Sequence, residues 1–116
     1  MLKYSDLNQI QKDFICNGCG GKGGIINPPE FIFHDSCNQH DFYYWRGCSE
    51  EDRKIADNTF YKFMKIAISK EKWYLKPHYH IWAYAYLKGV RISGKKYFHY
   101  DERMKNIGDL ACEMVV

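Results

Sequence analysis

Hydrophobic residues recur at helical spacing from the start of the chain, and this pattern predicts an all-α protein. Leu7, Ile10 and Phe14 lie at i, i+3 and i+7, which places them on one face of a short helix. Ser5 or Asp6 can cap this helix, because short side-chain oxygens accept hydrogen bonds from the free backbone amides of a first turn. The helix must end before the glycine-rich stretch that follows.

A second helix is expected after Pro28 and Pro29, because proline fits the first turn of a helix. This helix carries the run Cys-Asn-Gln-His-Asp-Phe-Tyr-Tyr at residues 37–44. We expect it to stop at Gly47, since glycine readily takes the backbone angles that end a helix.

The third helix opens at a polar pair and carries an acid on its apolar face. Ser49 and Asp52 form a capping pair, and the helix extends to about Ser69. Its inward stripe consists of four hydrophobic residues, Phe60, Tyr61, Met64 and Ile68. Asp57 lies one turn before this stripe, where an unpaired buried carboxylate would be costly. Asp57 therefore needs a partner inside the protein.

A fourth helix is predicted from Pro77 to about Arg91. The tail beyond it has a mixed pattern that assigns no element, and a short hairpin across residues 92–100 is left open. The chain offers enough hydrophobic residues for one modest core and no linker that would divide it. We therefore expect a single small helical domain over residues 1–116, with two antiparallel core helices that carry the site.

The composition is that of one ordinary folded domain. The chain has 116 residues, of which 46% are hydrophobic and 27% are charged. The net charge of +3 is mild and dispersed, which argues against a nucleic-acid partner and fits adsorption to an anionic lipid surface. No apolar run approaches the ~20 residues of a transmembrane helix, so we expect no membrane-spanning segment.

Five cysteines in so short a chain indicate disulfide staples or a metal site. Because staples form in oxidising compartments, we expect the protein to be secreted or otherwise delivered outside the cytoplasm. The first residues lack the apolar core of a secretory signal. A removed leader or a different export route would account for this.

A glycine-rich stretch and a His-Asp pair carry the candidate chemistry. Residues 16–24 read Cys-Asn-Gly-Cys-Gly-Gly-Lys-Gly-Gly, a loop whose backbone can turn its carbonyls and amides toward a ligand. His40 and Asp41 follow on the second helix, with a cysteine at minus three and a tyrosine at plus four. A His-Asp dipeptide alone is not specific, so the signal lies in its combination with the loop and with Asp57.

Taken together, these pieces resemble the phospholipase A2 superfamily. The matching features are a cysteine- and glycine-rich calcium loop, the motif Cys-x-x-His-Asp-x-x-Tyr on a helix, and a later Asp on an antiparallel helix. The compact form Cys-x-x-His-Asp-Phe-x-Tyr is most similar to the bacterial, fungal and viral branches. The resemblance covers residues 16–64 and implies a calcium-dependent hydrolase that acts on phospholipid at a membrane or micelle surface.

The resemblance implies catalytic roles for four residues, His40, Asp57, Tyr44 and Tyr61. His40 would take a proton from the attacking water, since a neutral imidazole is a base near neutral pH. Asp57 would hold the opposite ring nitrogen and so fix the tautomer. Tyr44 would donate a hydrogen bond to Asp57, and Tyr61 would add a second hydroxyl.

The resemblance also implies a calcium site beside the base. Asp41 would bind the ion through its carboxylate, because calcium prefers oxygen ligands. Backbone carbonyls would complete the ligand set, from Gly18, Gly20 and Lys22. Gly23 is an alternative to Lys22, because the loop has one residue more than the family's pattern. The ion would polarise the ester carbonyl, and the Gly20 amide would donate to the same oxygen.

A disulfide between Cys19 and Cys37 is implied by the family's spacing, and it would fasten the loop to the second helix. Cys16 is the alternative partner of Cys37, which would leave Cys19 free. A second bond between Cys48 and Cys112 is left open.

Two other functions remain open. The spacing Cys-x-x-Cys followed by Cys-x-x-His is also that of a structural zinc site, which would make the protein a binding module without catalysis. Its ligands would be Cys16, Cys19, Cys37 and His40. A phospholipase fold without turnover is the other alternative. A metal phosphohydrolase centre on His34 and His40 is disfavoured, because six positions on one helix place them on opposite sides.

Overall fold

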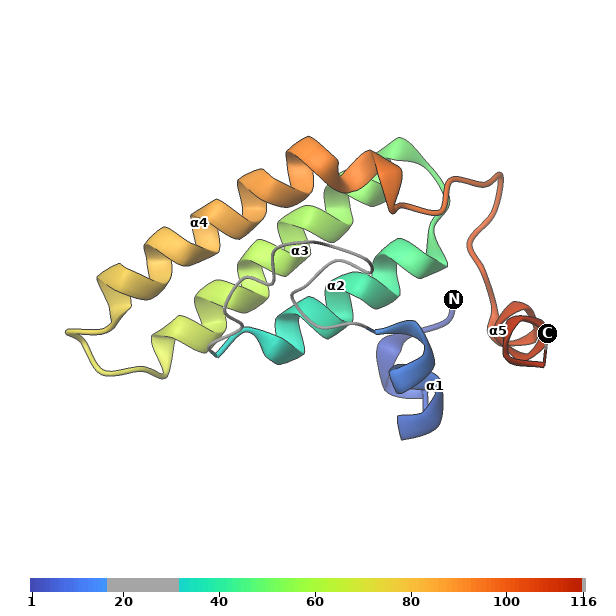
Figure 1. The fold of residues 1–116 in the computed structure, drawn as a ribbon, viewed down its shortest axis with the longest axis horizontal. Helices are drawn as coiled ribbons and strands as arrows, with labels where there is room; N and C mark the ends of the chain where they lie inside the picture. Colours follow the sequence, from blue (N-terminus) through green and yellow to red (C-terminus); the bar gives the residue numbers. More distant parts are fainter. Residues whose placement is uncertain (17–31, 116) are drawn as a thin grey trace.

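The protein is largely helical (Figure 1). The computed structural model describes residues 1–16 and 32–115. Its helices in chain order are η1 (Tyr4–Asp6), α1 (Gln9–Ile15), α2 (His34–Arg46), α3 (Glu50–Ser69), α4 (Lys76–Ser93), η2 (Gly94–Lys96) and α5 (Ile107–Met114). No strand occurs among these described residues, and the prediction of an all-α fold is confirmed.

Helices α2, α3 and α4 form the body of the molecule. Figure 1 shows them side by side in an up-down-up arrangement, and α3 contacts both of its neighbours. The main core lies between them and is built from Phe33, Cys37, Phe60, Met64, Ile68 and Ala83. Burial of such side chains contributes roughly 1.5–3 kcal/mol each, so this interface is the main source of the bundle's stability.

The connection between α2 and α3 is short, which forces these two helices to run antiparallel. Gly47 ends α2 as expected, with φ of 70°. A Cβ at Gly47 would overlap the carbonyl oxygen of His99, so only glycine fits there. The predicted capping box at the start of α3 is confirmed, because the Ser49 side chain accepts from the Asp52 amide and Asp52 accepts from the Ser49 amide.

The N-terminal segment differs from the prediction in its cap. Helix α1 is capped by Asn8, whose side chain accepts from the Gln11 amide, while the Gln11 side chain accepts in return from the Asn8 amide. Ser5 and Asp6 belong instead to η1, so the expectation that one of them caps the first helix was wrong. Asn8 forms a complete capping box, which satisfies two amides rather than one.

The region after α4 contains no hairpin in the part that the structure describes. Helix α4 continues to Ser93, and η2 follows it directly. Tyr100 pairs with Cys48, at the end of α2, in an isolated parallel bridge. The hairpin alternative over residues 92–100 is therefore wrong, because residues 92–93 continue α4, residues 94–96 form η2, and the backbone of His99 bonds to Tyr44 and Cys48.

Residues 97–105, here called the C-terminal strap, run along the end of α2. Four backbone hydrogen bonds hold the strap, and their donors and acceptors are His99 N to Tyr44 O, Cys48 N to His99 O, Asp101 N to Cys48 O and Lys105 N to Arg46 O. Beyond the strap, α5 buries Leu110 against Phe42 and Trp45 in a second hydrophobic cluster. The strap and α5 thus fix the end of the helix that carries His40.

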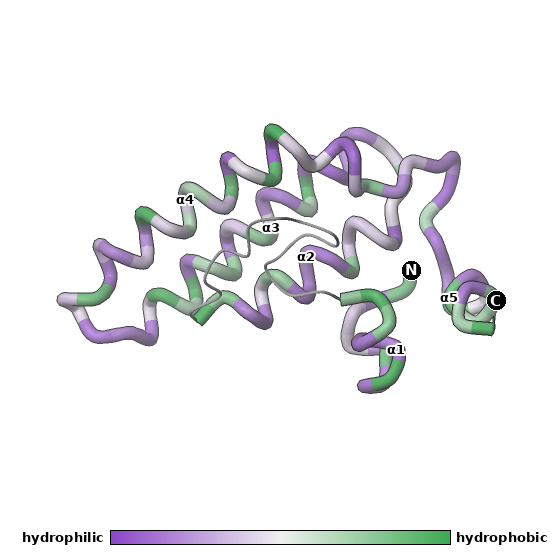
Figure 2. Tube along the Cα trace, viewed as in Figure 1, coloured by the Kyte–Doolittle hydropathy of each residue, from purple (hydrophilic) through white to green (hydrophobic). Residues whose placement is uncertain are grey.

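Hydrophobic and hydrophilic positions alternate along α2, α3 and α4 (Figure 2). This is the pattern of helices that bury one face and expose the other. In the described part of the chain, no helix combines the length and the hydrophobicity that a membrane span requires.

Candidate active site

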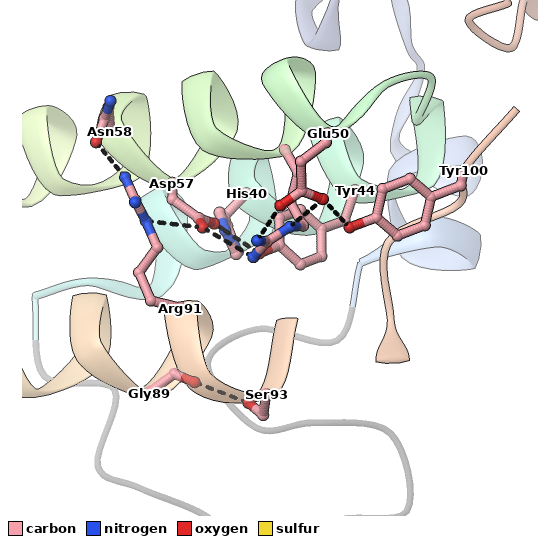
Figure 3. Close-up of polar contacts among 10 residues, drawn as sticks. His40, Tyr44, Glu50, Asp57, Asn58, Gly89, Arg91, Ser93 and Tyr100 are labelled. Atoms are coloured by element: carbon pink, nitrogen blue, oxygen red, sulfur yellow. Dashed lines mark hydrogen bonds and ion pairs between the residues drawn. The ribbon is translucent and has the colours of Figure 1, made fainter. Parts of the chain in front are cut away.

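The side chains of His40 and Asp57 meet between α2 and α3 (Figure 3). His40 Nε2 lies 2.8 Å from Asp57 Oδ1. Asp57 is completely buried and His40 is 6% exposed, so water competes little for this contact. Because the two helices run antiparallel, a residue in the middle of one faces a residue in the middle of the other. The contact between His40 and Asp57 that the sequence predicts is present.

Tyr44 completes this contact from one helical turn beyond His40. Its hydroxyl donates to Asp57 Oδ1 at 2.6 Å. Burial, together with the hydrogen bond to Asp57, raises the pKa of Tyr44 and keeps the hydroxyl a donor. The His40 ring is stacked on Phe60 at 4.5 Å and contacts the Tyr44 ring at 4.2 Å between centroids. These two rings restrict the orientation of the imidazole.

Tyr61 does not have the place that the resemblance implies. It is partly buried and packs against the main core, and Lys65 Nζ lies 4.8 Å from its ring centroid. In the described residues no hydrogen bond joins its hydroxyl to Asp57. The side of Asp57 that a second hydroxyl would occupy faces two arginines instead.

Arg53 and Arg91 are the residues at this site that the sequence analysis missed. Arg91 Nε lies 3.1 Å and Arg53 Nη1 lies 3.6 Å from Asp57 Oδ2. Arg53 precedes Asp57 by four residues on α3, and that spacing was a signal which could have found it. Arg91 comes from α4, and no local pattern connects it with Asp57.

A second polar layer surrounds Arg53. Its guanidinium donates to both carboxylate oxygens of Glu50, at 2.5 and 3.3 Å, and Tyr100 donates to the same carboxylate. The hydrogen bonds from Arg53 and then from Tyr100 lower the pKa of Glu50 to about 2. Figure 3 shows the resulting chain of contacts from the C-terminal strap to Asp57.

The expected calcium site falls mostly on residues that the structure does not describe. Gly18, Gly20 and Lys22 all lie outside the described residues. Asp41 follows His40 on α2 and is partly exposed. Among the described residues no group of three or more His, Cys, Asp or Glu side chains is placed to hold a metal ion. Of the expected ligands, the described part of the chain thus contains Asp41 alone.

The Cys16 thiol is influenced by the nearby charges of α1 and α2. Burial is the main cause that raises the pKa of this thiol to about 12; the carboxylates of Asp41 and Asp13 raise it further, and the Lys12 ammonium lowers it. The thiol therefore stays protonated near neutral pH.

The structure describes four of the five cysteines. Cys16, Cys48 and Cys112 are free thiols, so the Cys16–Cys37 alternative and the Cys48–Cys112 bond are both absent. Cys16 Sγ instead donates to the carbonyl of Asn38 at 3.2 Å. Cys37 is buried and does not belong to these free thiols. Its expected partner, Cys19, lies outside the described residues.

The other His-Asp pair lies away from this centre. His34 begins α2, is exposed, and its Nε2 lies 3.1 Å from the Asn38 side-chain nitrogen. Asp35 is also exposed, in the first turn of the helix. The two histidines of α2 therefore have different surroundings, and His40 alone contacts a buried acid.

Comparison of the chain with protein-family models, with curated proteins and with solved structures found no match. A neutral imidazole that donates from Nε2 to a buried carboxylate leaves Nδ1 as a proton acceptor. An arrangement of this kind can activate a water molecule or a hydroxyl group.

Proposed function

We propose that the protein is a calcium-dependent phospholipase A2-type enzyme that hydrolyses the sn-2 ester of glycerophospholipids. The observation that carries this proposal is the buried contact of His40 with Asp57, completed by Tyr44 from the same helix as His40. Burying a carboxylate completely costs desolvation free energy, which a role in stability alone does not account for. A general base needs such a carboxylate beside its imidazole, because the hydrogen bond keeps the ring in one tautomer.

In the proposed reaction His40 acts as the base. Its Nδ1 takes a proton from water, which then attacks the ester carbonyl carbon. Asp57 accepts the Nε2–H hydrogen bond throughout and stabilises the imidazolium that forms. His40 then returns the proton to the departing alcohol oxygen, and a fatty acid and a lysophospholipid are released.

Calcium would be held by the Asp41 carboxylate and by the backbone carbonyls of Gly18, Gly20 and Lys22. When bound, it would supply positive charge to the oxygen that becomes negative in the transition state. The Gly20 amide would donate to the same oxygen. The support for a cation at this place is that Asp41 directly follows His40 on α2 and is partly exposed.

A Cys19–Cys37 disulfide is part of the same proposal. It would join the glycine loop to α2 one turn before His40 and hold the loop carbonyls opposite Asp41. It also implies an oxidising destination, so secretion or delivery outside the cytoplasm belongs to the proposal. The substrate would be met at a membrane or micelle surface.

The two alternatives have less support. The zinc module needs His40 and Cys16 as ligands, but His40 Nε2 is engaged by Asp57 and the Cys16 thiol donates to a backbone carbonyl. A phospholipase fold without turnover has no evident cause in the contacts of His40 and Asp57.

The deciding experiment is hydrolysis of a mixed-chain phosphatidylcholine, with different acyl chains at the two positions, in the presence and absence of calcium. Mass spectrometry identifies which fatty acid is released. Calcium-dependent release of the sn-2 chain supports the proposal. Release of neither chain from any phospholipid, together with tight zinc in the reduced protein, would establish the binding module.

A further inference from the structure

The two oxygens of the Asp57 carboxylate face different partners. Oδ1 accepts from Tyr44 and contacts His40 Nε2. Oδ2 is buried and has no hydrogen-bond partner among the described residues, and its neighbours are the two cationic groups of Arg91 and Arg53. The burial of Oδ2 is therefore offset by the positive charges of the two arginines and not by a hydrogen bond.

The two arginines are not equivalent in this role. Arg53 is also engaged by Glu50, whose carboxylate already balances its charge. Arg91 donates through Nη2 to the neutral Asn58 side chain at 2.6 Å, and its Nε lies 3.1 Å from Asp57 Oδ2. Arg91 is thus the cation here whose charge no other described carboxylate balances.

A contact on Oδ2 matters because the orientation of the Asp carboxylate plane is not fixed by the side chain itself. The last torsion of Asp is broad and roughly two-fold, so a partner on one oxygen alone leaves the carboxylate free to turn. Arg91 reaches this carboxylate from α4, while His40 and Tyr44 reach it from α2. Contacts from two different helices fix its rotation.

We propose that Arg91 is a positioning residue of the active site. It holds Asp57 through Oδ2, so that Oδ1 remains directed at His40 Nε2, and it makes the third helix of the bundle part of the site. The kinetic consequence rests on the function proposed above, whereas the positioning of Asp57 does not. The two are therefore measured separately.

The structural measurement uses the resonance of the His40 Nε2 proton in the NMR spectrum of the full chain. A proton held between an imidazole and a buried carboxylate resonates far downfield and exchanges slowly with water. Arg91→Met keeps a long unbranched side chain but removes the cation, and the resonance should broaden or move upfield. Arg91→Lys restores a charge without the planar fork and should recover the resonance in part. Arg103→Met is the matched control, because it removes an exposed arginine paired with Asp109.

Kinetics distinguish positioning from a purely structural role. Loss of positioning should lower kcat by about 10-fold or more and change KM by less than about 2-fold, because substrate contacts remain. If Arg91 has only a structural role, Arg91→Met should leave kcat, KM and the downfield resonance at the values of the Arg103→Met control. That result would overturn the proposal.

Wild-type protein provides a second measurement if Arg91→Met does not fold. The Nε proton of Arg91 should exchange with solvent much more slowly than that of Arg103, because it is buried beside Asp57. Equal exchange of the two protons would also overturn the proposal. If wild-type protein hydrolyses no phospholipid, the proposed function fails, and the two NMR measurements still decide whether Arg91 positions Asp57.

Discussion

Gly94 lies so close to the hydroxyl of Tyr44 that no side chain fits between them. A Cβ at Gly94 would overlap this hydroxyl and would lie 3.2 Å from Tyr44 Cζ and 3.3 Å from Arg53 Nη1. The same hydroxyl donates to Asp57. Gly94, the first residue of η2, therefore packs against the polar cluster of Tyr44, Arg53 and Asp57 directly after α4 ends. The absence of a side chain at Gly94 is therefore a requirement of the site.

Replacing Gly94 with Ala should destabilise the protein and disturb Tyr44. Overpacking of this kind typically costs about 1–3 kcal/mol, and urea unfolding measures it. Gly89→Ala is the matched control, because Gly89 lies within α4 and a Cβ there meets nothing within 4 Å. The control should gain up to about 1 kcal/mol from helix propensity. Equal stability of the two variants would contradict the close approach of Gly94 to Tyr44.

His40→Asn should abolish hydrolysis while the helical content stays unchanged. Loss of a general base lowers the rate by about 10²–10⁴-fold. His34→Asn should retain nearly full activity, because His34 is exposed at the start of α2, away from Asp57. Initial rates on phosphatidylcholine and circular dichroism of both variants provide the measurement. An inactive His34 variant beside an active His40 variant would show that the base has been misassigned.

Removal of calcium with a chelator should stop turnover, and added calcium should restore it. Asp41→Asn should weaken calcium binding by at least about 10-fold, or ~1.4 kcal/mol, because neutral carbonyls supply the other proposed ligands. Asp35→Asn is the control on the same helix, and calorimetric titration compares the two variants. Full activity in excess chelator would exclude this mechanism.

Glu50 should contribute to stability in a pH-dependent way. Its pKa in the folded protein is lowered from 4.5 to about 2, first by the hydrogen bond from Arg53. A carboxyl group with a lowered folded pKa stabilises the protein above its unfolded pKa, and this contribution is lost as the pH falls through the folded value. The stability difference between wild type and Glu50→Gln should therefore be constant above about pH 5 and shrink between pH 4.5 and 2.

Chemical unfolding at a series of pH values measures this difference. Glu51→Gln is the control, because it removes the same charge from the same turn of α3 without the Arg53 contact. A difference that does not change with pH would show that Arg53 does not hold Glu50 ionised in the folded protein.

The parts of the fold that the sequence predicts are those with a local signal. Ser49 and Asp52 predict the start of α3, and Gly47 predicts the end of α2. An acid on the apolar stripe of α3 indicates that Asp57 has a buried partner, and the structure supplies that partner in His40. Each of these features depends on residues within one helix or at its ends.

The parts that the sequence does not predict depend on packing between distant segments. Arg91 reaches Asp57 only because α4 lies against α3. Helix α1 begins at Gln9 because Asn8 and Gln11 form a complete capping box there, which satisfies two backbone amides. The strap beside α2 has no periodicity to predict it, since its partners are backbone atoms.

The strap also determines which substitutions this protein can accumulate. Its four hydrogen bonds to the end of α2 use main-chain atoms alone, so they do not depend on which side chains the strap carries. Phe98 is buried and Tyr100 donates to Glu50, but an exposed position such as Glu102 can change over evolutionary time while the strap keeps its place. Gly47 is the opposite case, because any larger residue there would strike the carbonyl of His99. Among distant relatives, this glycine should persist where the exposed positions of the strap that it faces have changed.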